Sequence, residues 1–145
     1  MRRKQVTGTL VLCGLLIQLL IVALGCTANA ESPGQIELST TEFDLGVVPN
    51  DKPVSQVFQV RNAGRGTLEV LGLSTSCGCT TAEIGDHRLA PGATTDLTVT
   101  YDPQAHDGAT GEFTRIVYVR SDDPETPETT LTLRVKVVDP YKESN

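Results

Sequence analysis

The chain has 145 residues, with 12 Lys and Arg against 18 Asp and Glu, and a formal net charge of −6 at pH 7. Residues 1–30 hold three of the basic residues and none of the acidic ones, so the remainder, about one domain in length, carries a net charge of −9. Such a domain lacks the basic patch that binds nucleic acid and the polybasic segment that binds anionic lipid. We therefore expect no nucleic-acid partner, and any membrane attachment has to come from a covalent lipid.

The N-terminal segment has the order of residues that is typical of a secretory signal. Arg2, Arg3 and Lys4 come first, an apolar stretch over Leu10–Gly25 follows, and small residues come next. This apolar stretch of sixteen residues is shorter than the ~20 residues with which a helix spans a bilayer. We therefore predict an exported protein of the cell envelope rather than a retained transmembrane helix.

Two cleavage sites compete at the end of this segment. Ala28–Ala30 is an A-x-A site, and cutting there would release a soluble periplasmic or secreted protein that begins at Glu31. Ala23–Cys26 resembles the lipobox of bacterial lipoproteins, in which the cysteine receives a diacylglyceryl group and becomes the first mature residue. Ala23 departs from that pattern, because lipoboxes usually have Leu at this position. We favour lipidation of Cys26 and a membrane-anchored lipoprotein.

From Gln35 onward, short runs of alternating apolar and polar residues are separated by turn residues at intervals of about ten. This pattern is typical of a β-sandwich or β-barrel, and in no window do apolar residues repeat with the 3.6-residue period of a helix. In chain order we expect strands over Gln35–Ser39, Glu42–Val48, Val54–Arg61, Thr67–Ser74, Thr80–Ile84, Ala93–Tyr101, Glu112–Arg120 and Thr129–Val138. The predicted fold is an all-β, immunoglobulin-like β-sandwich of about seven to eight strands. The expected divisions are a signal peptide over 1–25, a flexible tether over 26–34, the sandwich over 35–139 and a C-terminal tail over 140–145.

Alternation also predicts which side chains face the core. The clearest inward sets are Leu97, Val99 and Tyr101 in one strand, and Leu131, Leu133, Val135 and Val137 in the last. Two polar stretches, 102–111 and 122–128, are expected to be loops. The second is acidic but lacks the ligand spacing of a calcium loop, so we interpret it as a solvated surface.

Cys77 and Cys79, separated by Gly78, are the only cysteines of the predicted domain. Residues two apart on a strand are about 6.6 Å apart, at the long end of the ~4.4–6.8 Å range of Cα separations in disulfides. Gly78 can relax the backbone toward a tighter turn. Three interpretations remain open: a structural pair (a local disulfide or two buried thiols), a redox-active dithiol, and a site for a soft metal such as Cu(I).

We favour the structural pair, because the C-x-C motif lacks the helix N-terminus that activates a C-x-x-C thiolate. A metal site would need a third ligand, for which His87 is a candidate, although its charged neighbours favour solvent exposure. His106 is expected to be a plain loop residue. No nucleophile motif or phosphate-binding loop is present, so we predict no catalytic residue and no cofactor.

Several motifs occur together in a fixed order: FDLG at 43–46, FQVRNAG at 58–64, SCGCTT at 76–81, YDP at 101–103 and SDDP at 121–124. In these motifs the chain resembles the bacterial domain of unknown function fifteen-seventy-three, which is similar to Hydin-type (ASH) immunoglobulin-like domains. The resemblance runs from about Ile36 to Val138 and implies an exported β-sandwich, often a lipoprotein, with no established activity. We therefore expect a non-enzymatic structural or protein-interaction module with an unidentified protein partner in the envelope. The alternative is a thiol-redox or Cu(I)-handling protein that acts through Cys77 and Cys79.

Overall fold

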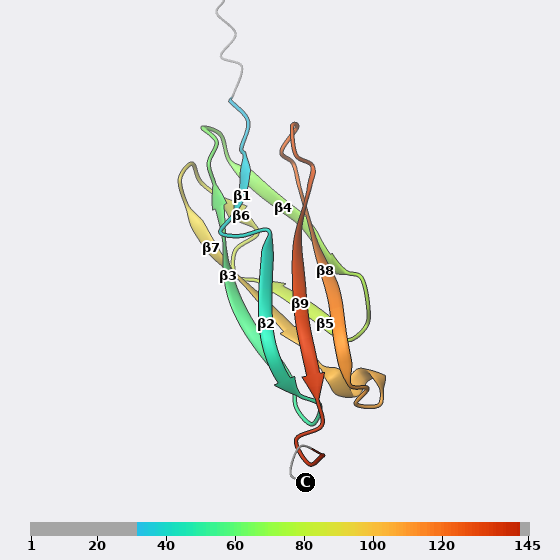
Figure 1. The fold of residues 1–145 in the computed structure, drawn as a ribbon. Helices are drawn as coiled ribbons and strands as arrows, with labels where there is room; N and C mark the ends of the chain where they lie inside the picture. Colours follow the sequence, from blue (N-terminus) through green and yellow to red (C-terminus); the bar gives the residue numbers. More distant parts are fainter. Residues whose placement is uncertain (1–31, 143–145) are drawn as a thin grey trace, which may run out of the picture. The chain divides into compact units, whose positions relative to one another are not determined.

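The computed structural model describes residues 32–142 (Figure 1). The predicted signal peptide, Cys26, both cleavage sites, most of the tether and the end of the C-terminal tail lie outside the described residues. Within the described range, no helix is long and apolar enough to cross a membrane.

Residues 32–142 form nine strands in two packed sheets, so the predicted all-β sandwich is confirmed. One sheet has the strand order β1-β3-β7-β5 and the other has the order β2-β9-β8-β4-β6. In chain order the strands are β1 (Ile36–Leu38), β2 (Glu42–Pro49), β3 (Val54–Asn62), β4 (Leu68–Thr75), β5 (Thr80–Ile84), β6 (Arg88–Leu89), β7 (Thr94–Tyr101), β8 (Gly111–Ser121) and β9 (Glu128–Val138). Each of the eight predicted runs corresponds to one strand. The ninth, β6, has two residues and pairs with the start of β4.

The first two strands lie in different sheets. β1 pairs antiparallel with β3, whereas β2 pairs in parallel with the C-terminal strand β9. The β2–β9 register shifts between Asp44 and Val47, which marks a β-bulge. Gly46 adopts a φ of 71° there, a conformation that glycine enters without steric cost, and its N–H donates to Asp44 Oδ1 at 2.7 Å. The bulge thus explains why the glycine interrupts an otherwise alternating strand.

The core lies between the two sheets and consists of the side chains that alternation predicted. The inward sets of β7 and β9 are buried, as expected. Phe43 and Phe58 pack edge to face across the sandwich with ring centroids 5.2 Å apart. Each fully buried leucine in this core contributes roughly 2–3 kcal/mol through the hydrophobic effect. A smaller cluster at one end of the sandwich contains Val48, Cys79, Tyr101, Val135 and Val137, and it places the cysteine pair against the core.

Two buried polar side chains connect the loops at the other end of the molecule. Asn62 is fully buried: its Nδ2 donates to Gly66 O at 2.7 Å and Leu89 O at 2.9 Å, and its Oδ1 accepts two backbone N–H groups. Asp123 is 3% exposed. The interpretation of 122–128 as a solvated acidic surface is therefore wrong for Asp123, whose carboxylate accepts backbone hydrogen bonds from Ile36 and from its own loop.

Candidate functional site

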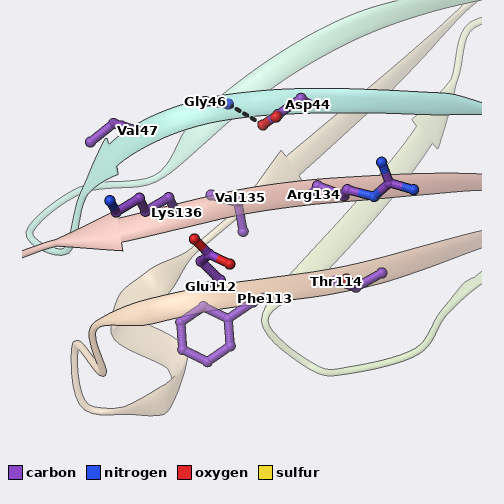
Figure 2. A pocket seen from close by; sticks show the side chains of 9 residues that line it. All are labelled: Asp44, Gly46, Val47, Glu112, Phe113, Thr114, Arg134, Val135 and Lys136. Carbon is purple, nitrogen blue, oxygen red and sulfur yellow. Dashed lines mark hydrogen bonds between the residues drawn. The ribbon is translucent and has the colours of Figure 1, made fainter.

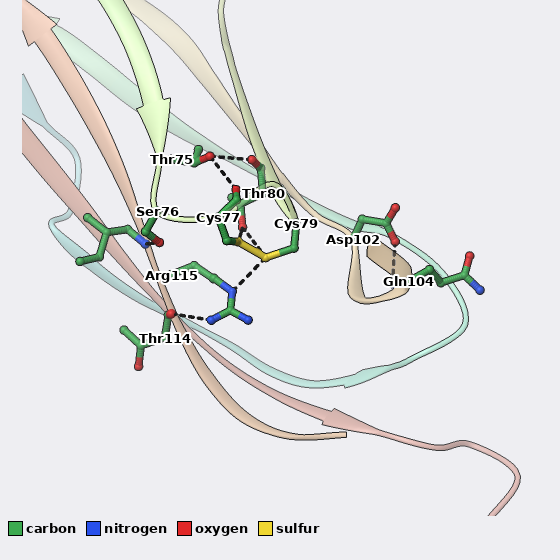
Figure 3. The surroundings of a disulfide bond; sticks show 10 residues. Thr75, Ser76, Cys77, Cys79, Thr80, Asp102, Gln104, Thr114 and Arg115 are labelled. Carbon is green, nitrogen blue, oxygen red and sulfur yellow. Dashed lines mark hydrogen bonds between the residues drawn. A yellow bond between two sulfur atoms is a disulfide. The ribbon is translucent and has the colours of Figure 1, made fainter. Parts of the chain in front are cut away.

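The candidate site is the turn between β4 and β5, which a Cys77–Cys79 disulfide closes (Figure 3). The two Cα atoms are 5.3 Å apart, well within the range that disulfides accept. Thr75 Oγ1 lies 2.9 Å from the carbonyl oxygens of both Cys77 and Thr80, so this hydroxyl ties the two ends of the turn together. Of the alternatives left open by the sequence, the structure contains the local disulfide.

Gly78 is not needed for the shape of this turn. Its φ lies outside the left-handed region, and a Cβ built on it would meet no atom within 4 Å. The turn therefore does not use the conformational freedom that Gly78 offers. The disulfide also contributes little as a staple. In the chain-entropy model, a loop of three residues gives about 1.5 kcal/mol, compared with about 3 kcal/mol for a 15-residue loop.

The two sulfur atoms have different surroundings. Cys79 is 1% exposed and packs in the small core cluster, whereas Cys77 is only partly buried. Arg115 of β8 donates from Nε to Cys79 Sγ at 3.0 Å (Figure 3). The guanidinium carbon lies 4.9 Å from the ring centroid of Phe113 and 5.7 Å from that of Tyr101, within cation–π range of both. Cys79 Sγ therefore faces the guanidinium of Arg115, which two aromatic rings hold in place.

Sequence reasoning missed Arg115, although a signal for it exists. The residue has the same parity on β8 as Phe113, Val117 and Val119, an apolar series that faces the core. A charged side chain in an inward-facing series needs a partner or an aromatic contact when it is partly buried. The pattern does not reveal that this partner is a sulfur atom in another turn.

Both histidines are exposed, as expected, but His106 and not His87 lies near the cysteines. His87 lies beside the start of β4, where its Nδ1 is 2.9 Å from Val70 O, and the group of possible metal ligands around the two cysteines does not include this candidate. His106 ends the 3₁₀ turn η1 (Pro103–His106), and one of its ring nitrogens and the two Sγ atoms all lie within 4.8 Å of one another. A hydrogen bond of 2.8 Å from Asp102 N to Cys79 O brings the turn that carries His106 to the cysteines. In the reduced state, two sulfurs and one imidazole nitrogen would form a donor set that suits a soft metal.

A second feature is the open edge of β3. β1 pairs only with Val60–Asn62 of β3, and Ser39 N donates to Gln59 O at 2.9 Å. Within residues 32–142, no strand pairs with the earlier part of β3 on this side. Hydrogen-bonding direction alternates along a strand, so Ser55 and Val57 direct their backbone groups to the same open side as Gln59. The Val57 side chain is 48% exposed.

An open depression of about 540 Å³ lies over β9 beside the bulge of β2 (Figure 2). Its lining combines two acidic and two basic side chains with a few apolar ones from three strands: Asp44, Gly46, Val47, Glu112, Phe113, Thr114, Arg134, Val135 and Lys136. Small-molecule pockets are enclosed and mostly apolar, with a few convergent polar groups. The depression is open, and its charged side chains carry both signs, so we assign it no ligand.

Residues 36–137 match the family described as "Protein of unknown function (DUF1573)". The chain belongs to the DUF1573 family. The matched range covers nearly all of the two sheets and includes the disulfide turn, Arg115 and the open edge of β3. A comparison of the sequence with curated proteins finds no match.

Solved structures share the fold of this DUF1573 domain. A protein of unknown function from Porphyromonas gingivalis W83 has a TM-score of 0.65 and 24% identity, over 71% of this chain and 46% of that one. The ASH/PapD-like domain 7 of human CEP192 has a TM-score of 0.58 and 10% identity, over 72% and 85%. The VesB protease of Vibrio cholerae has a TM-score of 0.55 and 19% identity, over 71% and 31%. This chain thus spans less than half of the first and third of these proteins. At these identities the likeness shows the fold alone, a sandwich of the immunoglobulin-like, ASH/PapD type.

Proposed function

We propose that this DUF1573 protein is an exported, non-enzymatic protein-interaction module of the cell envelope, anchored by a lipid on Cys26, which binds an extended segment of a partner protein along the open edge of β3. The observation that carries the interaction is the stretch of β3 that contains Ser55 and Val57, which pairs with β7 on one side and with no described strand on the other. An extended peptide adds to such an edge as a further strand, through main-chain hydrogen bonds.

The composition of this edge supports the proposal. Proteins usually protect exposed edges with charged residues, proline or very short strands, because an open edge pairs with other chains. Val54–Val60 (VSQVFQV) contains no charge and no proline, although 21% of the whole chain is charged. The end of β3 that pairs with β1 does carry charge, because Arg61 of β3 forms an ion pair with Glu37 of β1 at 3.3 Å. The unprotected half is therefore the part that suits a partner.

The anchor rests on the sequence of the N-terminal segment. The basic start, the apolar stretch and the lipobox-like Ala23–Cys26 support export and lipidation. A lipid on Cys26 would hold the domain at a membrane surface, with a short polar tether between the lipid and Gln35. A single acyl chain gives only reversible membrane attachment, whereas the several acyl chains of a lipoprotein give a stable anchor.

The test is photo-crosslinking in intact cells with a photoreactive residue at position 55, compared with position 71. Leu71 is 58% exposed on β4 and serves as the control surface. We expect one discrete protein adduct from position 55 and none from position 71. Val57→Pro removes the outward N–H but no β3–β7 hydrogen bond, so it should reduce the adduct several-fold, whereas Val57→Thr should preserve it.

Thermal melts establish that both variants fold, and Val57→Lys provides a second test that keeps the N–H and adds an edge charge. This variant should also weaken the adduct. The proposal fails if position 55 gives no adduct, or if the adduct persists at full yield in folded Val57→Pro and Val57→Lys proteins.

A further inference from the structure

We infer that the Cys77–Cys79 disulfide is a thiol-exchange site with a fixed polarity, in which an external thiolate attacks Cys77 Sγ and Cys79 leaves as the thiolate. The co-reactant is a dithiol, either a small molecule or a pair of cysteines on another protein. This inference does not depend on the open edge of β3, which involves other residues and another strand.

The two sulfur atoms differ in their access to solvent. Cys77 is partly exposed and lies between two exposed residues, Ser76 and Gly78, whereas Cys79 is 1% exposed. Exchange requires the attacking sulfur to reach one sulfur of the disulfide, and the choice of sulfur depends on access. An incoming thiolate can therefore reach Cys77, while Tyr101 and Val135 pack around Cys79 in the core cluster.

The two sulfur atoms also differ as leaving groups. A sulfur leaves faster when its thiolate is more stable, and a nearby cation stabilises a thiolate. Arg115 Nε already donates to Cys79 Sγ at 3.0 Å, and this charge-assisted contact becomes stronger when the sulfur acquires a negative charge. The guanidinium is positioned beforehand, because it stacks on Phe113 and donates from Nη1 to Thr114 O at 2.9 Å.

Cys79 Sγ is thus both the less accessible sulfur atom and the better leaving group. Thr80 Oγ1 lies 3.8 Å from Cys79 Sγ and 3.5 Å from Cys77 Sγ, so a hydroxyl is also within reach of both sulfurs. A purely structural disulfide needs no such asymmetry. As a staple across three residues, it also constrains the unfolded chain very little.

The exchange balances as follows. A thiolate of the external dithiol forms a new S–S bond to Cys77 Sγ, and the electron pair of the Cys77–Cys79 bond leaves on Cys79. The second thiol of the dithiol loses its proton and attacks the first sulfur of the dithiol, which is bonded to Cys77 Sγ in the mixed disulfide. This attack closes the dithiol's own disulfide and releases Cys77. The dithiol is oxidised to a disulfide, the domain is reduced to two thiols, and the two protons of the dithiol are transferred, through solvent, to Cys77 and Cys79.

The experiment uses the full chain, expressed with its own signal segment and purified from the envelope in detergent. Dithiothreitol at neutral pH is the dithiol, and alkylation followed by intact mass gives the rate of reduction. We expect native protein to be reduced without denaturant. Arg115→Gln should slow reduction about tenfold, because the leaving thiolate loses its cation. Arg120→Gln changes an exposed arginine of the same strand and should have no effect.

Single-cysteine variants test the polarity separately. With oxidised glutathione, Cys79→Ser should form a mixed disulfide at Cys77 at least about tenfold faster than Cys77→Ser forms one at Cys79. This comparison remains decisive if Arg115→Gln does not fold, and Arg115→Lys, which keeps the charge, should then give an intermediate reduction rate. Reduction only in urea, equal rates for the two cysteine variants, or equal rates for Arg115→Gln and Arg120→Gln in folded protein would each overturn the inference.

Discussion

Asp123 Oδ2 accepts a hydrogen bond from Ile36 N at 2.9 Å, which links the loop between β8 and β9 to the first strand, 87 residues earlier in the chain. The other carboxylate oxygen accepts from the backbone N–H groups of Glu125 at 2.9 Å and Thr126 at 3.2 Å. Burial raises the pKa of Asp123, but these three backbone donors together outweigh it and hold the pKa below its ordinary value. One carboxylate thus fixes both the loop and the start of the sandwich.

Asp123→Asn should destabilise the domain by about 2 kcal/mol. The amide keeps one acceptor oxygen but turns an NH₂ group toward a backbone donor, and hydrogen bonds to a charged group contribute about 1.5–3 kcal/mol. A loss of this size lowers the melting temperature by roughly 10 °C in a domain of about 100 residues. Calorimetry of the variant beside Asp86→Asn, an exposed carboxylate, measures the effect. Equal melting temperatures would contradict this account of the loop.

The same carboxylate predicts a pH dependence. A carboxyl group whose pKa is lowered on folding stabilises the protein above its unfolded pKa of about 3.9, and this stabilisation is lost as the pH falls through the folded pKa. The wild-type protein should therefore lose stability below about pH 4, and the gap between wild type and Asp123→Asn should shrink there. Urea unfolding of both proteins at pH 7 and at pH 3 measures the two gaps. A gap that is the same at both pH values would show that Asp123 does not act through its charge.

How far the sequence predicts this structure depends on the kind of feature. Strand positions follow from local alternation, except for β6, whose two residues are too few to show a pattern although Leu89 is buried in the core. Features made by contacts between distant segments leave no such pattern. Sequence proximity favoured His87 as a neighbour of the cysteines. In the fold, however, the turn that follows β7 lies beside the cysteines, and this turn carries His106. The contacts of Arg115 and Asp123 were missed in the same way, because Cys79 lies 36 residues from Arg115 and Ile36 lies 87 residues from Asp123 in the chain.

Gly78→Ala should be tolerated, although the residue lies between the two cysteines. An added Cβ would meet no atom within 4 Å, so the melting temperature should stay within a few degrees of wild type and the disulfide should still form. Gly66→Ala is the contrasting variant, because its Cβ would lie 1.8 Å from Ser32 O. It should lower the melting temperature markedly. Thermal melts and intact mass without reductant test both, and a large loss of stability in Gly78→Ala would contradict the geometry of the turn.

Lipidation of Cys26 predicts both the mass and the location of the mature protein. If the lipobox-like site is used, the native protein begins at Cys26, carries the added mass of diacylglyceryl and acyl groups, and sediments with membranes. Cys26→Ala removes the acceptor sulfur and should abolish the added mass and the membrane association of processed protein. Cys13→Ala, in the apolar stretch of the signal, should leave both unchanged. Intact mass and membrane fractionation of the three proteins distinguish the alternatives. A native chain that begins at Glu31 without lipid would mean that the A-x-A site is used, and the domain would then act as a soluble protein beyond the membrane.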